Sequence, residues 1–464
     1  MRSKTFFIVF FCATLLNCKA QMKLISYPQQ GPDTRLLKNN YRLWENTLPF
    51  NGLCISFNAN EVNNNSSTGY YGNWKGALSS SVFKKNINLR YADYTHAIND
   101  LKVCNFKSFK NNFIILPLFE VNWSPWEDDK SWLIMINNLK VACRIAFKSG
   151  LKGVVLDTET YGSPQNLNLL FYCEQFIDYT LKKGNTTAYC KIDKGIDAGK
   201  LDDLFPKKNR IVYWKNNEGY IGNLRLERVY LNIYKDKNNN YYYPLLDIKY
   251  YKQVENIIEK VKERGRKIIL AINEEFPKAE IILTCGPSYV KNVLQNNYGL
   301  NDTNNYLRTG YGLIVPLVKG MLEELPNKKM KLIDGQEQTY YHKKDKDFNN
   351  ALKSFNQASV YFGKDSLLYQ QFMNKAIGLY MRPASDKNNS NPRLFSWSDL
   401  NATLKYVKAQ PNIEYLWFYE ENESYWYLEE LKSRYLNSSN MSRIGGSDNT
   451  NYLKIIRTNL NLAN

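Results

Sequence analysis

The sequence predicts an α/β protein whose main domain is a (β/α)8 barrel of the TIM type, with an inserted β-rich subdomain. The chain has 464 residues, of which 44% are hydrophobic and 14% aromatic, enough apolar material for a large core. Its central part repeats an amphipathic helix, a short turn and an apolar strand ending in polar residues. Seven such strands can be placed, and the position of the eighth is open. An open doubly wound sheet competes, but no glycine-rich nucleotide turn follows an early strand.

The first two strands are predicted at residues 52–57 and 113–119, where short apolar runs are bounded by polar residues. The next unit is the clearest in the chain. Acidic Asp128 begins a helix whose apolar positions recur every three or four residues, and Gly150 ends it before the strand 153–156.

Four further units complete the predicted barrel. The first is a helix from about residue 254 that Pro277 stops, with Gly265 as a candidate kink. The helices are expected near 254–276, 316–326, 367–373 and 398–407, and the strands after them near 280–283, 330–333, 376–381 and 415–419. Residues 186–248 break this rhythm because they alternate at period two, which indicates a β-rich insertion. We assign 21–436 to the barrel and 437–464 to a C-terminal tail.

The first twenty residues have the pattern of an export signal. Two basic residues precede an apolar run at 6–16 that is too short to span a bilayer. Small residues favour cleavage after Ala20, while Cys18 also fits a lipoprotein box and leaves a lipid anchor as the alternative. We expect a signal peptide at 1–20 and a secreted or periplasmic protein, membrane-anchored if Cys18 is lipidated, with no transmembrane segment.

Composition also limits the partners. The formal net charge is +18, but no run of five basic residues and no nucleic-acid module is present, so we do not expect nucleic-acid binding. For an exported protein, a carbohydrate is the favoured partner, an anionic polysaccharide included. Two histidines are too few for a multi-histidine metal centre, and no Walker A loop occurs, so neither a metal nor a cofactor is predicted.

Carboxylates follow three of the predicted strands, where a barrel places its active site. Asp157 and Glu159 are two residues apart and project to one side, Asp334 and Glu337 follow another strand, and Glu421 follows the last. Glycoside hydrolysis needs one protonated carboxyl and one ionised carboxylate. We expect Glu159 to be the general acid/base and Glu337 the nucleophile or water-activating base. Asp157 and Asp334 would tune the pKa values and bind hydroxyls, with Glu421 as the alternate partner.

Aromatic residues lie beside these acids and offer flat faces on which sugar rings stack. We expect them to bind substrate, together with His342. The aromatic set comprises Trp123, Trp126, Tyr161, Tyr340, Tyr341, Trp417 and Trp426.

The segments 153–159 and 415–420 resemble strands of secreted (β/α)8 glycoside hydrolases, and the resemblance covers about residues 50 to 430. It implies hydrolysis of the O-glycosidic bonds of a polysaccharide or oligosaccharide by paired carboxylates. The Asp-x-Glu is similar to the end of the chitinase-type motif, but Gly153 and Val155 stand where that motif has further aspartates, and no single family is indicated. Two other functions stay open: a non-catalytic glycan-binding protein, and a polysaccharide lyase that uses Tyr340 or Tyr341.

Overall fold

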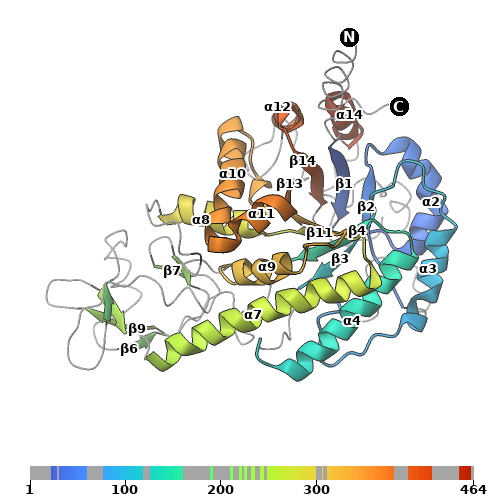
Figure 1. Ribbon diagram of the computed structural model, residues 1–464. Helices are drawn as coiled ribbons and strands as arrows, with labels where there is room; N and C mark the ends of the chain where they lie inside the picture. The colour runs from blue at the N-terminus through green and yellow to red at the C-terminus, as the bar shows by residue number, and fades with distance from the viewer. Residues whose placement is uncertain are drawn as a thin grey trace, which may run out of the picture.

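The computed structural model describes residues 22–28, 31–59, 77–118, 126–159, 248–298, 306, 311–380, 396–420 and 449–460, together with six short strands between 189 and 244. In it, eight parallel strands close into a barrel (Figure 1), which confirms the predicted fold. The barrel strands are β1 (Lys23–Pro28), β2 (Gly52–Ile55), β3 (Phe113–Pro117), β4 (Gly153–Asp157), β11 (Glu280–Leu283), β12 (Lys331–Asp334), β13 (Met373–Tyr380) and β14 (Ile413–Glu420). The predicted signal peptide and Cys18 lie outside the described residues.

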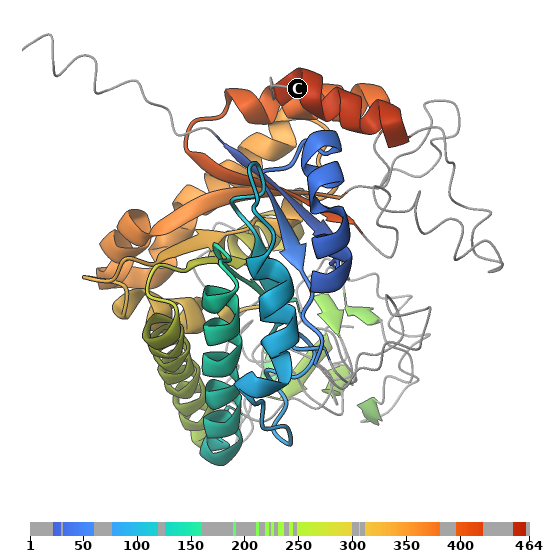
Figure 2. The same cartoon turned by 90° about the vertical axis from the view of Figure 1, so that its right-hand side faces the viewer.

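Helices cover the outside of the barrel, and Figure 2 shows α4 and α7 side by side along it. The α-helices are α2 (Thr34–Thr47), α3 (Thr95–Lys102), α4 (Asp129–Lys148), α7 (Ile248–Glu275), α8 (Pro287–Tyr298), α9 (Ile314–Glu323), α10 (Asp345–Gln357), α11 (Ser366–Phe372), α12 (Trp397–Ala409) and α14 (Asn449–Leu460). The described residues also include the 3₁₀ helices η1 (Tyr91–Tyr94), η5 (Glu337–Thr339) and η6 (Ala358–Asp365). No helix in the described part of the chain is both long and apolar enough to span a membrane.

The strand that the sequence pattern left unplaced is β1, and it closes the barrel between β14 and β2. Its residues pair in parallel with β14 from Lys23 opposite Tyr415 to Pro28 opposite Glu420. On the other side, Ile25 and Ser26 pair with β2. The strand directly follows the predicted signal peptide, and its apolar run is short, which is why the pattern of apolar runs did not reveal it.

Alternate residues of the barrel strands fill the interior. Val155, Ile282 and Ile333 lie at one level because β4 pairs with β11 and β11 with β12 without a shift. Together with Ile25 and Trp417 they belong to a buried apolar cluster inside the barrel. The intervening residues face the helices and form the larger core between sheet and helix layer. This alternation directs Asp157, two residues beyond Val155, toward the barrel axis.

Short antiparallel strands occupy the segment between β4 and α7. They form a four-stranded sheet in the order β5-β10-β9-β6 and a two-stranded sheet of β7 and β8. Their bounds are β5 (Tyr189–Lys191), β6 (Arg210–Val212), β7 (Gly219–Ile221), β8 (Leu224–Leu226), β9 (Leu231–Lys235) and β10 (Tyr241–Pro244).

The segment predicted as a C-terminal tail contains the helix α14. Ile456 and Leu460 are buried, and Lys408 of α12 donates a hydrogen bond to the carbonyl of Asn459 at 3.0 Å. Arg457 donates to the carbonyl of Asn46, which lies near the end of α2, at 3.3 Å. The helix therefore packs between the last and the first units of the barrel.

The helix α7 continues through Gly265, so the expected kink does not occur. Instead this glycine allows a close approach between helices. A Cβ at Gly265 would lie 2.0 Å from the carbonyl oxygen of Leu317 on α9, and a Cβ at Gly320 of α9 would lie 1.9 Å from that of Lys262. The two glycines together bring the backbones of α7 and α9 into contact.

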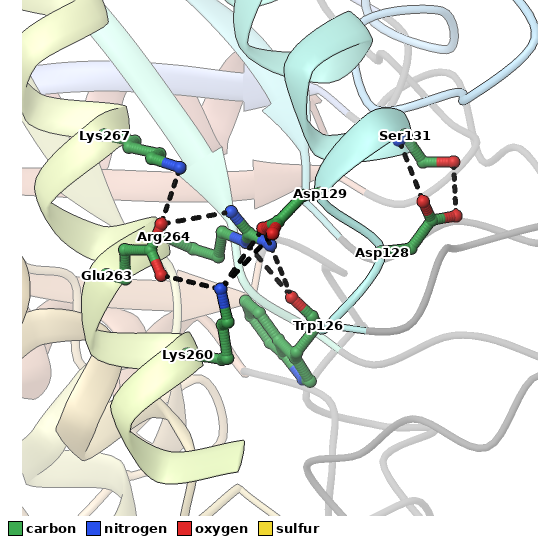
Figure 3. Close-up of polar contacts among 8 residues, drawn as sticks. All are labelled: Trp126, Asp128, Asp129, Ser131, Lys260, Glu263, Arg264 and Lys267. Carbon is green, nitrogen blue, oxygen red and sulfur yellow. Dashed lines mark hydrogen bonds and ion pairs between the residues drawn. The ribbon is translucent and has the colours of Figure 1, made fainter. Parts of the chain in front are cut away.

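A buried arginine connects α7 to α4 (Figure 3). The guanidinium of Arg264 is fully buried, and its Nε and Nη2 donate to the carbonyl of Trp126 at 3.1 and 2.8 Å. Nη2 also pairs with Asp129 in the first turn of α4, and the cation lies 5.2 Å from the ring centroid of Trp132. Burial of this charge is balanced by hydrogen bonds, an ion pair and an aromatic face.

Replacement of Gly265 by Ala should destabilise the barrel because the new Cβ would push α7 away from α9. We expect a loss of about 2 kcal/mol in the free energy of unfolding, measured by urea denaturation. Glu259→Ala, on the exposed part of the same helix, should change it by less than about 0.5 kcal/mol. Equal stability of Gly265→Ala and wild type would contradict the close helix contact.

Candidate active site

The ends of β3, β4, β11 and β12 lie level at the mouth of the barrel, by which we mean the C-terminal end of its strands. Pro117 pairs with Asp157, and Leu283 pairs with Leu156 on one side and with Asp334 on the other. The loops that follow these strands therefore start from one edge. This is the face on which barrels of this type carry their active sites.

Asp157 is a partly exposed carboxyl at the centre of this edge. Its Oδ1 accepts hydrogen bonds from the backbone N–H of Glu159 at 3.0 Å and from the hydroxyl of Thr284 at 3.2 Å. The phenol of Tyr27, at the end of β1, also donates to it. Burial raises the pKa of Asp157 to about 6, while these three hydrogen bonds oppose the rise.

Glu159 lies two residues further and is also partly exposed. Burial, and then the negative charge of Asp157, raise its pKa to about 8. At neutral pH, Glu159 therefore holds a proton while Asp157 is largely ionised. Two neighbouring carboxyls whose environments separate their pKa values in this way are suited to act as an acid and a base.

Glu337 is a third carboxyl of the mouth, and only 8% of it is exposed. Its backbone N–H donates to the carbonyl of Thr284 at 3.1 Å, and its Oε2 accepts from the thiol of Cys285 at 3.2 Å. Burial, with a smaller contribution from Asp157, raises the pKa of Glu337 well above its usual value. Glu337 thus lies close enough to Asp157 for the charge of that carboxyl to act on it.

Asp334 is fully buried and is held in the adjacent loops. Its carboxylate accepts hydrogen bonds from the N–H and the hydroxyl of Ser288 at 3.0 and 2.8 Å, and from the N–H of Gln336 at 3.2 Å. Ser288 lies in the first turn of α8, so Asp334 caps that helix. Asp334 thus joins the start of α8 to Gln336 in the loop after β12, which indicates that Asp334 shapes the loop that leads to Glu337.

Aromatic rings line the mouth beside the three carboxyls. Trp417 is buried and donates from Nε1 to the carbonyl of Gly335 at 2.8 Å. The rings of Tyr27 and Tyr340 contact it edge-on, each at 5.1 Å between centroids. Tyr340 also stacks on Tyr419 at 5.2 Å. These rings form a packed layer below the carboxyls.

Among the predicted aromatic residues that the structure describes, Tyr341 has the most exposed ring, with 41% of it exposed. It contacts Tyr380 at 5.1 Å between centroids, next to the packed layer. Its ring is therefore far more exposed than that of Tyr340, which is buried.

Two predicted substrate-binding residues lie elsewhere. Trp126 stacks on Trp132 of α4 at 5.2 Å and belongs to the contact between α4 and α7. The His342 ring contacts Phe348 of α10 at 5.5 Å, and burial lowers the pKa of His342. The remaining predicted site residues, Trp123, Tyr161, Glu421 and Trp426, lie outside the described residues.

The structure adds Tyr27, Thr284, Cys285, Tyr380 and Tyr419 to the site. Tyr27 was missed because its strand was not placed. Tyr419 could have been found, since it stands two residues after Trp417 on a predicted strand and so faces the same side. Thr284 and Cys285 directly follow a predicted strand, but their types carry no chemical signal comparable to a carboxylate.

The Glu159→Gln variant should be more stable than the wild type above neutral pH. A group whose pKa is raised on folding stabilises the native state at low pH, and this contribution is lost as the pH rises from about 4 through about 8. Gln resembles the protonated acid and removes this loss. After allowance for solvent screening, we expect a gain on the order of 2 kcal/mol at pH 8 and little change at pH 4, measured by urea denaturation.

Glu275→Gln is the matched control, because hydrogen bonding to Arg144 on α4 lowers the pKa of Glu275. That variant should lose stability at pH 8 instead of gaining it. If Glu159→Gln and Glu275→Gln changed stability in the same direction at pH 8, the raised pKa of Glu159 would be refuted.

No protein-family model matches this chain, and no curated protein sequence matches it either. In the described residues, no group of three or more His, Cys, Asp or Glu side chains is arranged to hold a metal ion. The closed parallel barrel serves many unrelated chemistries, so the function has to be inferred from the residues at its mouth.

Proposed function

We propose that the protein is a glycoside hydrolase that cleaves O-glycosidic bonds of a polysaccharide or oligosaccharide at the mouth of the barrel. The observation that carries this proposal is the pair Asp157 and Glu159. They stand two residues apart at the end of β4, with pKa values raised to about 6 and about 8 respectively. A protonated and an ionised carboxyl side by side are the groups that glycoside hydrolysis requires.

In the proposed reaction, Glu159 gives its proton to the oxygen of the leaving sugar. It is suited to this because it is protonated near neutral pH and partly exposed. A second carboxyl then attacks the sugar or activates a water molecule. Glu337 remains the predicted candidate for this step, and Asp157 is the carboxyl of the three that is most readily ionised.

The aromatic layer supports a carbohydrate as the substrate. Trp417, Tyr27 and Tyr340 form an apolar floor next to the carboxyls, and Tyr341 adds an exposed ring. Flat rings beside polar groups match the two kinds of surface that a sugar presents.

The charges at the mouth favour a neutral sugar over an acidic one. Among the described residues, no Lys or Arg forms an ion pair with Asp157, Glu159 or Glu337; Lys152, Arg264 and Arg266, for example, pair with other carboxylates. A uronic acid next to the ionised carboxylate of Asp157 would be repelled. We therefore propose a neutral glycan as the substrate, in preference to the anionic polysaccharide that the net charge suggested.

Export remains part of the proposal. A signal peptide at 1–20, or a lipid anchor at Cys18, would bring the enzyme to polysaccharides outside the cytoplasm.

Reducing-end release from a panel of neutral and anionic polysaccharides tests the proposal directly. We expect the wild type to release sugar from a neutral polymer, and Glu159→Gln to lower kcat by about 10²-fold or more because the leaving oxygen loses its acid. Glu275→Gln, remote from the mouth, should retain full activity. Since Glu159→Gln is expected to be stable, its inactivity would not reflect misfolding.

Other outcomes would identify the alternatives. Glycan binding without release, equal in wild type and Glu159→Gln, would establish a binding protein for which the exposed ring of Tyr341 matters. A product that absorbs in the ultraviolet, formed from an anionic glycan, would establish a lyase. Full activity of Glu159→Gln would refute the assigned acid.

A further inference from the structure

Thr284 and Cys285, directly after β11, lie between the two loops that carry the carboxyls. On the β4 side, the hydroxyl of Thr284 accepts a hydrogen bond from the N–H of Thr158 at 2.9 Å and donates to Asp157 at 3.2 Å. The hydroxyl of Thr158 donates to the carbonyl of Cys285 at 2.7 Å and accepts from its N–H at 2.9 Å. Thr158 stands between Asp157 and Glu159, so these bonds fix the backbone that carries both acids.

The same two residues hold the β12 side. The carbonyl of Thr284 accepts from the N–H of Glu337 at 3.1 Å, and the thiol of Cys285 donates to the carboxylate of Glu337 at 3.2 Å. Each residue thus contacts both loops through its backbone or side chain. The side chain of Cys285 is almost fully buried, as is that of Thr284.

We propose that Thr284 and Cys285 form a positioning clamp, which sets the spacing between the Asp157–Glu159 pair and Glu337 and directs one donor to each of two carboxyls. This inference rests on the proposed function for its role in catalysis. It assigns no chemical step to the clamp. The two residues act through the carboxyls that they hold, and a substrate need not touch them.

The direction of the Thr284 donor follows from its partners. Because an ionised carboxylate can only accept, the hydroxyl of Thr284 is the donor in its bond to Oδ1 of Asp157. This bond favours the ionised form of Asp157 and opposes the effect of burial on its pKa. The clamp therefore keeps Asp157 ionisable beside a protonated Glu159.

The groups that face Asp157 come from each element packed against it. Tyr27 stands on β1, Glu159 on its own loop, Cys285 after β11 and Glu337 on η5. The neighbouring end of β3 contributes Leu116 and Pro117, which do not titrate. Within the described residues Tyr27 and Thr284 are the side chains that donate to Asp157. Thr284→Val removes one of these two donors with little change in volume, whereas Thr284→Ser keeps it.

Thermal unfolding of the full chain at pH 4 and pH 8 tests the clamp without any substrate. Thr284→Val should unfold earlier than the wild type at both values, because the N–H of Thr158 loses its acceptor. The loss should be larger at pH 8, by about 1.5 °C for a pKa change of about one unit in a chain of this length, because Asp157 is ionised there and its pKa has risen further. Thr284→Ser should lower the unfolding temperature only slightly, and by the same amount at pH 4 and pH 8. An equal loss in Thr284→Val at both pH values would overturn the role in Asp157 ionisation.

Kinetics on a hydrolysed glycan provide the second readout. The acidic limb of kcat/KM should move to higher pH by about one unit in Thr284→Val, with kcat lowered and KM nearly unchanged, while Thr284→Ser follows the wild type. Cys285→Ala should lower kcat more than Cys285→Ser, because the serine hydroxyl can still donate to Glu337. An acidic limb of kcat/KM that does not shift in Thr284→Val would overturn the clamp. Equal effects of Cys285→Ala and Cys285→Ser on kcat would overturn it too. Absence of hydrolysis by the wild type would refute the proposed function alone, since the unfolding experiment still decides on Thr284.

Discussion

The unshifted parallel register of β4, β11 and β12 is the constraint on which the mouth of this barrel depends. Leu156, Leu283 and Asp334 lie at one level in neighbouring strands, so the loops after them begin side by side. A slip of one residue in β4 would turn Asp157 from the barrel axis to the helix layer. The carboxyl cluster is therefore a consequence of strand pairing, and the hydrogen bonds of the loops then refine its geometry.

The pKa of a buried carboxyl is lowered at the N-terminal end of the barrel and raised at its mouth. At the N-terminal end, burial of Glu280 is outweighed by a hydrogen bond from Tyr415 and by nearby lysines, so its pKa falls below the usual value. Its carboxylate lies 3.8 Å from Lys23, 3.0 Å from Lys152 and 3.7 Å from Lys331. At the mouth, Asp157 and Glu159 form no ion pair with a described cation and their pKa values rise. The N-terminal end thus holds a network of ion pairs, and the mouth holds carboxyls with raised pKa values, as the proposed reaction requires.

Much of the fold was predictable because apolar runs alternate with helical periodicity, and seven strands lie where this pattern places them. β1 was not, since Ser26 interrupts the apolar run of Lys23–Pro28 and the strand follows the predicted signal peptide. In the site, the carboxyls after β4 were found because they follow a strand at period two. The sequence pattern could not predict where the Asp334 side chain points. It turns toward Ser288 at the start of α8, and the position of that helix depends on tertiary contacts. Trp126 was misplaced for the same reason, since its neighbours Trp132 and Arg264 come from two helices.

Because pKa values at the mouth rise on folding, the protein binds a different number of protons in its folded and unfolded states. Glu159 is ionised in the unfolded chain at neutral pH but holds a proton in the folded barrel, where its pKa is about 8. Folding therefore takes up protons from the solution. Part of the heat of folding must then come from the buffer that supplies those protons. Calorimetry of this protein in phosphate and in Tris would report different enthalpies for one and the same structural transition.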